Sequence, residues 1–136
     1  PNDYAKAKAI NDWIFDSVKY VTDSTNSSVS ACDTLISRAG VCKDFAHLGI
    51  ALCRALDIPA RYFTGYAANL FPPDIHACFE VYIGKQWILF DPTDLSSKNE
   101  LVKIASGKDA SEAAVTIFYG NTYCSNMNIQ CDRIES

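Results

Sequence analysis

Hydrophobic side chains near the start of the chain repeat at the spacing of a helix. From residue 3 to about Tyr20, apolar residues recur every three or four positions, at Ile10, Trp13, Ile14, Val18 and Val21. This repeat predicts a helix with one buried face, which Asn2 and Asp3 can cap. The polar stretch 23–28, with the sequence DSTNSS, predicts a loop after it.

A short second helix is expected after this loop. Ser30 and Asp33 stand at the spacing of a capping box, in which each side chain accepts a hydrogen bond from a free backbone N–H group. We expect this helix to stop at Gly40, because glycine tolerates the left-handed conformation that ends many helices.

The third predicted helix is a very apolar segment that runs from about Cys42 to Leu56 and leaves almost no polar face. A helix that is apolar nearly all round lies in the middle of a domain, so we expect this one to be central. Pro59 forbids its continuation.

Strands are predicted after Pro59. The segments ARYFTGY (60–66), HACFEVYI (76–83) and QWILFD (86–91) have strand composition, and Gly84-Lys85 suits a hairpin turn between the last two. Segments 101–106, 114–120 and 127–134 predict further strands. Helices followed by an antiparallel sheet indicate the α+β class.

The predicted hairpin determines which residues face one another. A two-residue turn pairs Ile83 with Gln86, and the same register makes Asp91 the diagonal neighbour of His76 on one face. That face holds the polar groups of the hairpin, and the other face is apolar. The register therefore allows a hydrogen bond between Asp91 and His76, and it turns Cys78 toward Asp91.

The length, composition and net charge of the chain limit the classes of protein to which it can belong. A length of 136 residues predicts one domain, 1–136, and a net charge of −4 with scattered basic residues gives no support to nucleic-acid binding. We expect no membrane partner, because no apolar run approaches the ~18 residues that span a bilayer. No signal-peptide pattern is present, which gives a weak preference for the cytoplasm. Because the chain begins at Pro1, a fragment of a longer protein or a processed form stays open.

Six cysteines lie at positions 32, 42, 53, 78, 124 and 131. They form no C-x-x-C pair, and a domain with this many apolar residues favours reduced, mostly buried thiols over a disulfide framework. A bridge between Cys124 and Cys131 stays open. No metal site is expected, because neither histidine lies at a zinc-ligand spacing from a cysteine pair.

Cys42 is the candidate nucleophile. A thiol at a helix N-terminus meets the positive end of the helix dipole, which favours the thiolate, and its own backbone N–H can stabilise an oxyanion. Only two histidines could serve as its base. His47 lies about 140° around the helix from Cys42 and is expected to be a packed helix residue. His76 opens a strand and has Asp91 to orient it.

These segments together resemble a known family. The stretches AGVCKDFAHLGIALCRALDIPARYFTGY and HACFEVYIGKQWILFDPT are similar to the bacterial transglutaminase-like family, whose members are often described as cysteine proteases. The resemblance implies a papain-like core, in which a central helix packs on an antiparallel sheet, and a Cys–His–Asp triad at Cys42, His76 and Asp91. Family members often carry a preceding domain. Cys78 departs from the family pattern, which often has Trp there, and Asp57 stands where Gly is usual.

The expected activity is acyl transfer on amide bonds of a protein or peptide substrate. Attack by Cys42 gives an acyl-enzyme, which water resolves in a protease or amidase and an amine resolves in a transglutaminase. We favour hydrolysis and expect no cofactor. Tyr66, Cys78 and Glu80 are weaker candidates for lining the cleft. A non-catalytic binding module with the same fold is the competing hypothesis, and the oligomeric state is not predicted.

Overall fold

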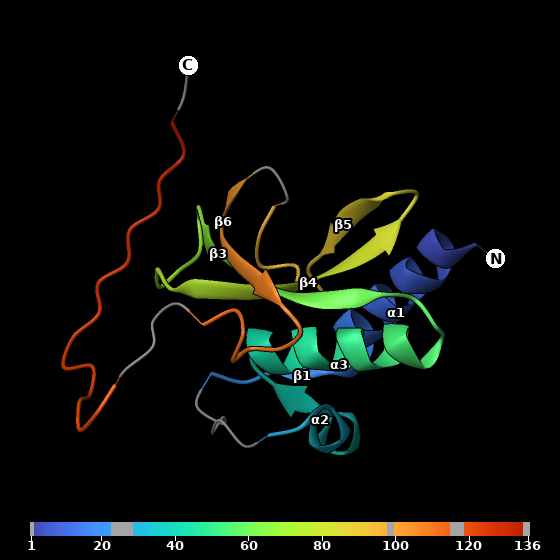
Figure 1. Cartoon of the computed structure of the whole chain (residues 1–136), viewed down its shortest axis with the longest axis horizontal. Helices are drawn as coiled ribbons and strands as arrows, with labels where there is room; N and C mark the ends of the chain where they lie inside the picture. Colours follow the sequence, from blue (N-terminus) through green and yellow to red (C-terminus); the bar gives the residue numbers. More distant parts are fainter. Residues whose placement is uncertain (1, 23–28, 98–99, 115–118, 135–136) are drawn as a thin grey trace.

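A computed structural model describes residues 2–22, 29–97, 100–114 and 119–134 of the chain (Figure 1). Within these residues, helices come first and the main sheet follows. In chain order, the elements are α1 (Asp3–Ser17), β1 (Lys19–Tyr20), α2 (Ala31–Ser37), β2 (Ala39–Gly40), α3 (Cys42–Ala55), β3 (Ala60–Ala67), β4 (Ile75–Ile83), β5 (Gln86–Phe90) and β6 (Leu101–Gly107).

The main sheet has four antiparallel strands in the order β5-β4-β3-β6. The helix α3 lies along one face of this sheet, and α2 packs against the other side of α3 (Figure 1). The predicted α+β architecture, with a central helix on an antiparallel sheet, is therefore confirmed.

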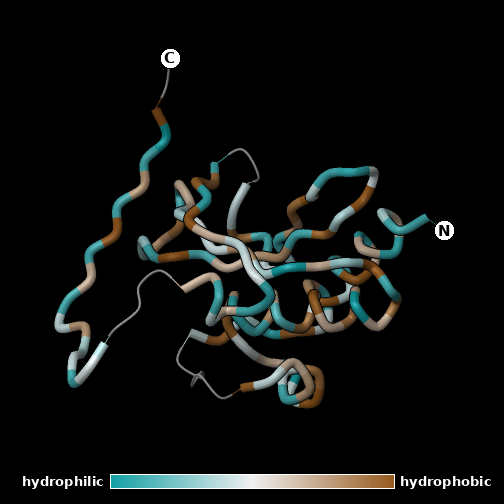
Figure 2. Tube along the Cα trace, viewed as in Figure 1, coloured by the Kyte–Doolittle hydropathy of each residue, from teal (hydrophilic) through white to brown (hydrophobic). Residues whose placement is uncertain are grey.

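The core fills the space between α3 and the sheet. Phe79 and Val81 of β4 are fully buried there together with Ala46 of α3. Gly49 lets the helix come close to the sheet, because a Cβ atom at this position would lie 2.5 Å from the Phe79 ring. Figure 2 shows hydrophobic segments gathered in this interior and a mainly hydrophilic chain in the C-terminal tail.

The hairpin register agrees with the prediction. Ile83 pairs with Gln86, and the pairing continues to Phe79 opposite Phe90. Gly84 and Lys85 form the turn, both with positive φ. The alternating apolar residues of both strands belong to the core or pack against it, so the polar side chains occupy the other face.

The first helix is shorter than predicted. It ends at Ser17 rather than near Tyr20, although its N-cap is Asn2 as expected. The residues beyond Ser17 form β1, which pairs in parallel with β2. Tertiary pairing therefore overrides the helical repeat in this last turn, which the pattern of apolar residues could not reveal.

The second helix begins as predicted and ends earlier. Ser30 and Asp33 form the expected capping box. The helix stops at Ser37, and Arg38, not Gly40, takes the left-handed conformation with φ 56°. The prediction that Gly40 ends this helix is wrong, because this glycine lies in β2 and is needed for a close contact described below.

The C-terminal third contains fewer strands than predicted. The strand at 101–106 is confirmed as β6, on the β3 edge of the sheet. The segment 127–134 is not a strand; its residues form part of an irregular and mainly exposed tail that runs outside the body of the molecule (Figure 1). Most of the strand expected at 114–120 falls on residues 115–118, outside the described residues.

Candidate active site

Cys42 is the first residue of α3, half-buried at the helix N-terminus. The short parallel pair of β1 and β2 leads the chain into this position, with Tyr20 opposite Gly40. Asp44, in the first turn of α3, accepts a hydrogen bond from the backbone N–H of Val41 at 3.0 Å. The start of the helix is therefore held by both backbone pairing and a side-chain cap.

Gly40 is required by the close approach of Asp44. A Cβ atom at residue 40 would lie 2.7 Å from Asp44 Cβ and 2.8 Å from its Oδ2. The Asp44 side chain is fully buried against this glycine. Asp44 was not among the residues predicted for the site, although an acidic residue in the first turn of a very apolar helix is a recognisable capping signal.

His76 and Asp91 form the predicted hydrogen bond. His76 Nε2 lies 2.7 Å from Asp91 Oδ2, and the imidazole is 1% exposed. Asp91 accepts further hydrogen bonds at both oxygens: the backbone N–H and hydroxyl of Thr93 donate to Oδ1, and those of Ser96 donate to Oδ2. These hydrogen bonds hold the carboxylate in one position, so that it can orient the imidazole.

These hydrogen bonds make the ionised form of Asp91 favourable. Burial by itself disfavours the charge, but the hydrogen bonds from His76, Ser96 and Thr93 outweigh burial and hold the pKa of Asp91 below its ordinary value of 3.8. The carboxylate therefore stays negative in the pH range where an imidazole partner can be charged.

The imidazole of His76 contacts two thiols as well as the carboxylate. Cys42 and Cys78 both lie near enough to this imidazole to favour its charged form. Burial disfavours the imidazolium, but the Asp91 hydrogen bond and these thiols outweigh that effect and raise the pKa of His76 well above its ordinary value of 6.5. Asp91 contacts Nε2, so this hydrogen bond leaves Nδ1 for other partners.

Cys78 lies beside this hydrogen-bonded pair. The ligand-type atoms of His76, Cys78 and Asp91 all lie within 4.8 Å of one another, in agreement with the predicted register. Cys78 is fully buried, and burial raises the pKa of its thiol to about 11. It is therefore a neutral thiol at neutral pH, unlike a group tuned for nucleophilic attack.

Tyr20 is a site residue that sequence analysis did not identify. Its hydroxyl lies near the backbone N–H of Cys42, and its ring packs on Phe45 with a centroid distance of 5.7 Å. Burial, and then the negative charge of the Cys42 thiolate, raise the pKa of Tyr20 above 10.0. The aromatic residue was predicted inside α1, so no sequence signal placed it near Cys42.

The two remaining residues that were predicted to line the cleft are Glu80 and Tyr66. Glu80 accepts a hydrogen bond from Arg61, which stacks over the Trp87 ring at 3.9 Å. Tyr66 lies opposite Ile75, one position from the pair of Gly65 and His76, and its role in the cleft stays a prediction.

His47 does not take part in this cluster. Its ring packs on Tyr62 with a centroid distance of 5.0 Å, as expected for a packed helix histidine. Burial is the main cause that lowers the pKa of His47.

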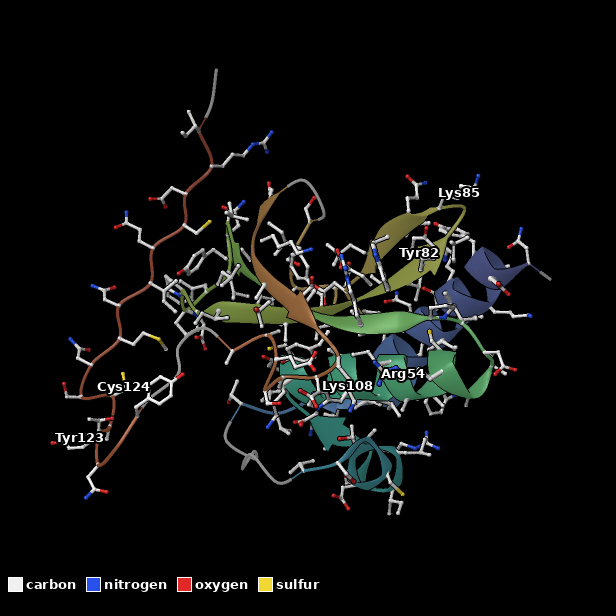
Figure 3. All side chains as sticks on the ribbon, in the orientation of Figure 1. Arg54, Tyr82, Lys85, Lys108, Tyr123 and Cys124 are labelled. Carbon is white, nitrogen blue, oxygen red and sulfur yellow. The ribbon has the colours of Figure 1, made fainter. Side chains whose placement is uncertain are left out.

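All six cysteines are free thiols, so Cys124 and Cys131 are not bridged. Cys53 and Cys78 are buried, whereas Cys32 and Cys124 are exposed. The expectation of reduced thiols is confirmed, but the expectation that most of them are buried is wrong. Cys124 lies on the tail that runs outside the body of the molecule (Figure 3).

Known proteins share this fold and these segments. The family model of the transglutaminase-like superfamily matches residues 1–92, which include all three residues of the predicted triad. A crystal structure of a "putative cysteine protease" from Cytophaga hutchinsonii is 60% identical, with a TM-score of 0.92 over 98% of this chain and 46% of that one. An uncharacterized protein of Mycobacterium tuberculosis is 30% identical over 88% of this chain and 43% of its own length.

A more distant structure has the same fold. Calcium-bound LapG of Legionella pneumophila is 20% identical with a TM-score of 0.64, over 91% of this chain and 76% of that one. The chain spans less than half the length of the Cytophaga and Mycobacterium proteins. No helix among the described residues is long and apolar enough to cross a membrane. The match over residues 1–92 establishes that the chain belongs to the transglutaminase-like superfamily.

Proposed function

We propose that this chain catalyses acyl transfer from amide bonds through Cys42, and that it acts as a cysteine protease or amidase. The observation that supports this proposal most directly is the hydrogen bond between Asp91 and His76, with the Cys42 thiol near the same imidazole at the N-terminus of α3. A nucleophile, a base and a group that orients the base are the three parts that thiol catalysis requires.

In the proposed mechanism, each of these three residues has one task. The Cys42 thiolate attacks the carbonyl carbon and forms the new C–S bond. The His76 imidazolium, held at Nε2 by Asp91, gives its proton to the leaving amine as the C–N bond breaks. Water then attacks the thioester while His76 accepts its proton, which releases the acid and restores the thiolate.

Two groups next to Cys42 suit the stabilisation of the oxyanion. The Cys42 backbone N–H lies at a helix N-terminus, where the dipole favours negative charge. The Tyr20 hydroxyl lies at this N–H and keeps its own proton for donation, since its pKa is raised. A substrate oxygen that displaces the hydroxyl from the N–H would meet both donors.

The acceptor distinguishes two activities of the same acyl-enzyme. Water gives hydrolysis, whereas a primary amine would give transamidation with the same three residues. We place hydrolysis first, since water reaches any solvent-accessible thioester. The Cytophaga protein, 60% identical and described as a "putative cysteine protease", supports the same choice.

The test compares two cysteine variants with the unaltered chain. Fluorescein-labelled casein and p-nitrophenyl acetate serve as acyl donors, with and without glycine ethyl ester as an amine acceptor. Cys42→Ala should lower turnover by more than about 10³-fold, because it removes the nucleophile. Its thermal midpoint should change little, because Cys42 is only half-buried.

Cys53→Ala is the matched control. Cys53 is fully buried in the core, so its truncation should lower the free energy of unfolding by about 1 kcal/mol and leave turnover unchanged. If Cys42→Ala retains turnover, or if both variants lose it equally, the chain is better described as a non-catalytic binding module. Amine incorporation that exceeds hydrolysis would favour the transglutaminase alternative.

A further inference from the structure

The N-terminal end of α3 points toward the loop 68–74, which joins β3 to β4. Arg54, in the last turn of the helix, donates a hydrogen bond to the carbonyl of Ala60 at the start of β3. Earlier in the helix, Gly49 approaches Phe79, which lies nearer to that loop on β4. The helix therefore begins at the same end of the sheet as the loop, as Figure 1 shows.

Cys42 and His76 reach the same level along this direction. Cys42 comes seven residues before Gly49 on a helix that rises about 1.5 Å per residue, which gives roughly 10 Å. His76 comes three residues before Phe79 on a strand that rises about 3.3 Å per residue, which also gives roughly 10 Å. Because Gly49 lies against Phe79, both site residues lie at the end of the sheet that carries the loop 68–74.

The tip of this loop is apolar and exposed. Phe71 is 94% exposed, and the two residues that follow it, Pro72 and Pro73, are exposed as well. Single exposed apolar residues are common on protein surfaces, whereas adjoining ones next to a candidate active site indicate a binding surface. His76 follows Phe71 by only five positions, so this surface adjoins the candidate active site.

Hydrogen bonds hold both ends of the loop. The backbone N–H of Ala68 donates to the carbonyl of Glu100 at 2.9 Å, and the side-chain amide of Asn69 donates to the Glu100 carboxylate at 3.2 Å. At the other end, the Asp74 carboxylate accepts a hydrogen bond from the next backbone N–H at 2.7 Å. Phe71 between these anchored ends therefore loses less conformational entropy on binding than it would on a free loop.

We propose that Phe71 determines substrate specificity, by contacting a large apolar side chain of a peptide that lies across Cys42 and His76. The substrate class is an extended peptide with an aromatic or branched aliphatic side chain near the bond that is cleaved. This inference rests on the proposed function, because it names the substrate class of the same site. The contact is present in the bound substrate and in the transition state alike, so its loss should raise KM more than it lowers kcat.

The first experiment measures side-chain preference in the unaltered chain and in Phe71→Ala. A library of fluorogenic peptide amides, varied at one position at a time, identifies where the unaltered chain prefers a large apolar side chain. For the preferred peptide, Phe71→Ala should raise KM by about 10-fold with kcat within about twofold, because one apolar contact is lost. The preference for this peptide over one with serine at the same position should fall by about 10-fold as well.

Phe15→Ala is the matched control. Phe15 is also an exposed phenylalanine, but it lies on α1, so its removal should keep the preference of the unaltered chain. Phe71→Tyr should restore most of the preference, because it keeps the aromatic ring. Far-UV circular dichroism and the thermal midpoint verify that each variant is folded; little change is expected, since both phenylalanines are exposed.

A binding measurement separates this inference from the proposed function. Fluorescein-labelled peptides, each with one phenylalanine at a different position of a Ser-Gly chain, are titrated with the Cys42→Ala chain and followed by fluorescence anisotropy. Addition of Phe71→Ala should weaken the tightest of these complexes by about 10-fold. The same addition of Phe15→Ala should not.

The inference is wrong if Phe71→Ala keeps the preference and the affinity, if Phe15→Ala loses them equally, or if no labelled peptide binds. Turnover with an unchanged preference in Phe71→Ala would overturn only this inference. Peptide affinity that depends on Phe71, without turnover of any acyl donor, would keep Phe71 as a binding residue and overturn only the proposed function.

Discussion

Tyr20 is the residue whose role changes most once its position is known. It belongs to a two-residue strand rather than to the first helix, and its hydroxyl lies near the backbone N–H of Cys42. The residue is 38% exposed, so part of it lies at the surface beside Cys42. A phenol that stays protonated beside an oxyanion donor is well suited to stabilise developing negative charge.

We predict that Tyr20→Phe lowers kcat by about 100-fold with little change in KM, because loss of one oxyanion donor affects mainly the transition state. Tyr82→Phe is the matched control: Tyr82 is also exposed, but it packs on Trp87 in the hairpin of β4 and β5. Steady-state kinetics with p-nitrophenyl acetate would measure the effect. An unchanged kcat in Tyr20→Phe would assign Tyr20 to packing on Phe45.

Asp91 should make the stability of the fold depend on pH. Its pKa is lower in the folded protein than the ordinary 3.8, so its ionisation stabilises the fold above about pH 4 and this contribution is lost as the pH falls. We predict that Asp91→Asn lowers the free energy of unfolding by about 1–3 kcal/mol at pH 7, since a buried hydrogen-bonding group loses its charged partner. The loss should shrink toward pH 3.

Urea unfolding at pH 3, 5 and 7 would measure this difference. Asp94→Asn is the control, because Asp94 is exposed and asparagine also tolerates its φ of 54°. His76 should respond as well. Without the Asp91 carboxylate its pKa should fall, and NMR titration of the imidazole would detect the change. A loss of stability independent of pH would contradict the assignment of an ionised Asp91.

At the scale of secondary-structure elements, the position of Cys42 depends on how α3 begins. Gly40 ends β2, and the buried Asp44 side chain occupies the space that a larger residue at position 40 would need. The same side chain caps the backbone N–H of Val41. The two features together set the angle at which the chain enters the helix, and therefore where the thiol points.

We predict that Gly40→Ala destabilises the fold by about 1–3 kcal/mol, because the new methyl group would overlap the Asp44 side chain at 2.7 Å. It should also slow alkylation of Cys42 as the helix start moves. Gly84→Asn is the matched control, since no atom lies within 4 Å of a Cβ at that turn and asparagine tolerates positive φ. Equal stability of Gly40→Ala and the unaltered chain would contradict this account.

The elements differ in how far the sequence could predict them. The central helix and the hairpin were predictable, because an apolar run from Cys42 and the Gly84-Lys85 turn are local signals. The end of α1 was not, because β1 and β2 form through pairing between segments that are distant in the sequence. The segment 127–134 alternates like a strand, but among the described residues it pairs with no other strand.

For the whole molecule, the hairpin register was sufficient to predict the bond between His76 and Asp91. It could not predict that α3 would bring Cys42 to the same imidazole, which only the family resemblance implied. Tyr20 and Asp44 were missed because their contacts are formed by tertiary packing. The chain spans less than half the length of its Cytophaga and Mycobacterium relatives.

The central claim is that the fold pairs an activated Cys42 thiolate with a charged His76. The most direct test is the rate of iodoacetamide labelling at Cys42 as a function of pH, read by peptide mass spectrometry, in the unaltered chain and in His76→Ala. We predict that Cys42 is labelled faster in the unaltered chain than in the variant across the range from about pH 6 to about pH 8, because a charged imidazole beside the sulfur stabilises its thiolate. Equal labelling rates in both proteins at every pH would contradict the thiolate–imidazolium pair and leave Cys42 as a packing residue.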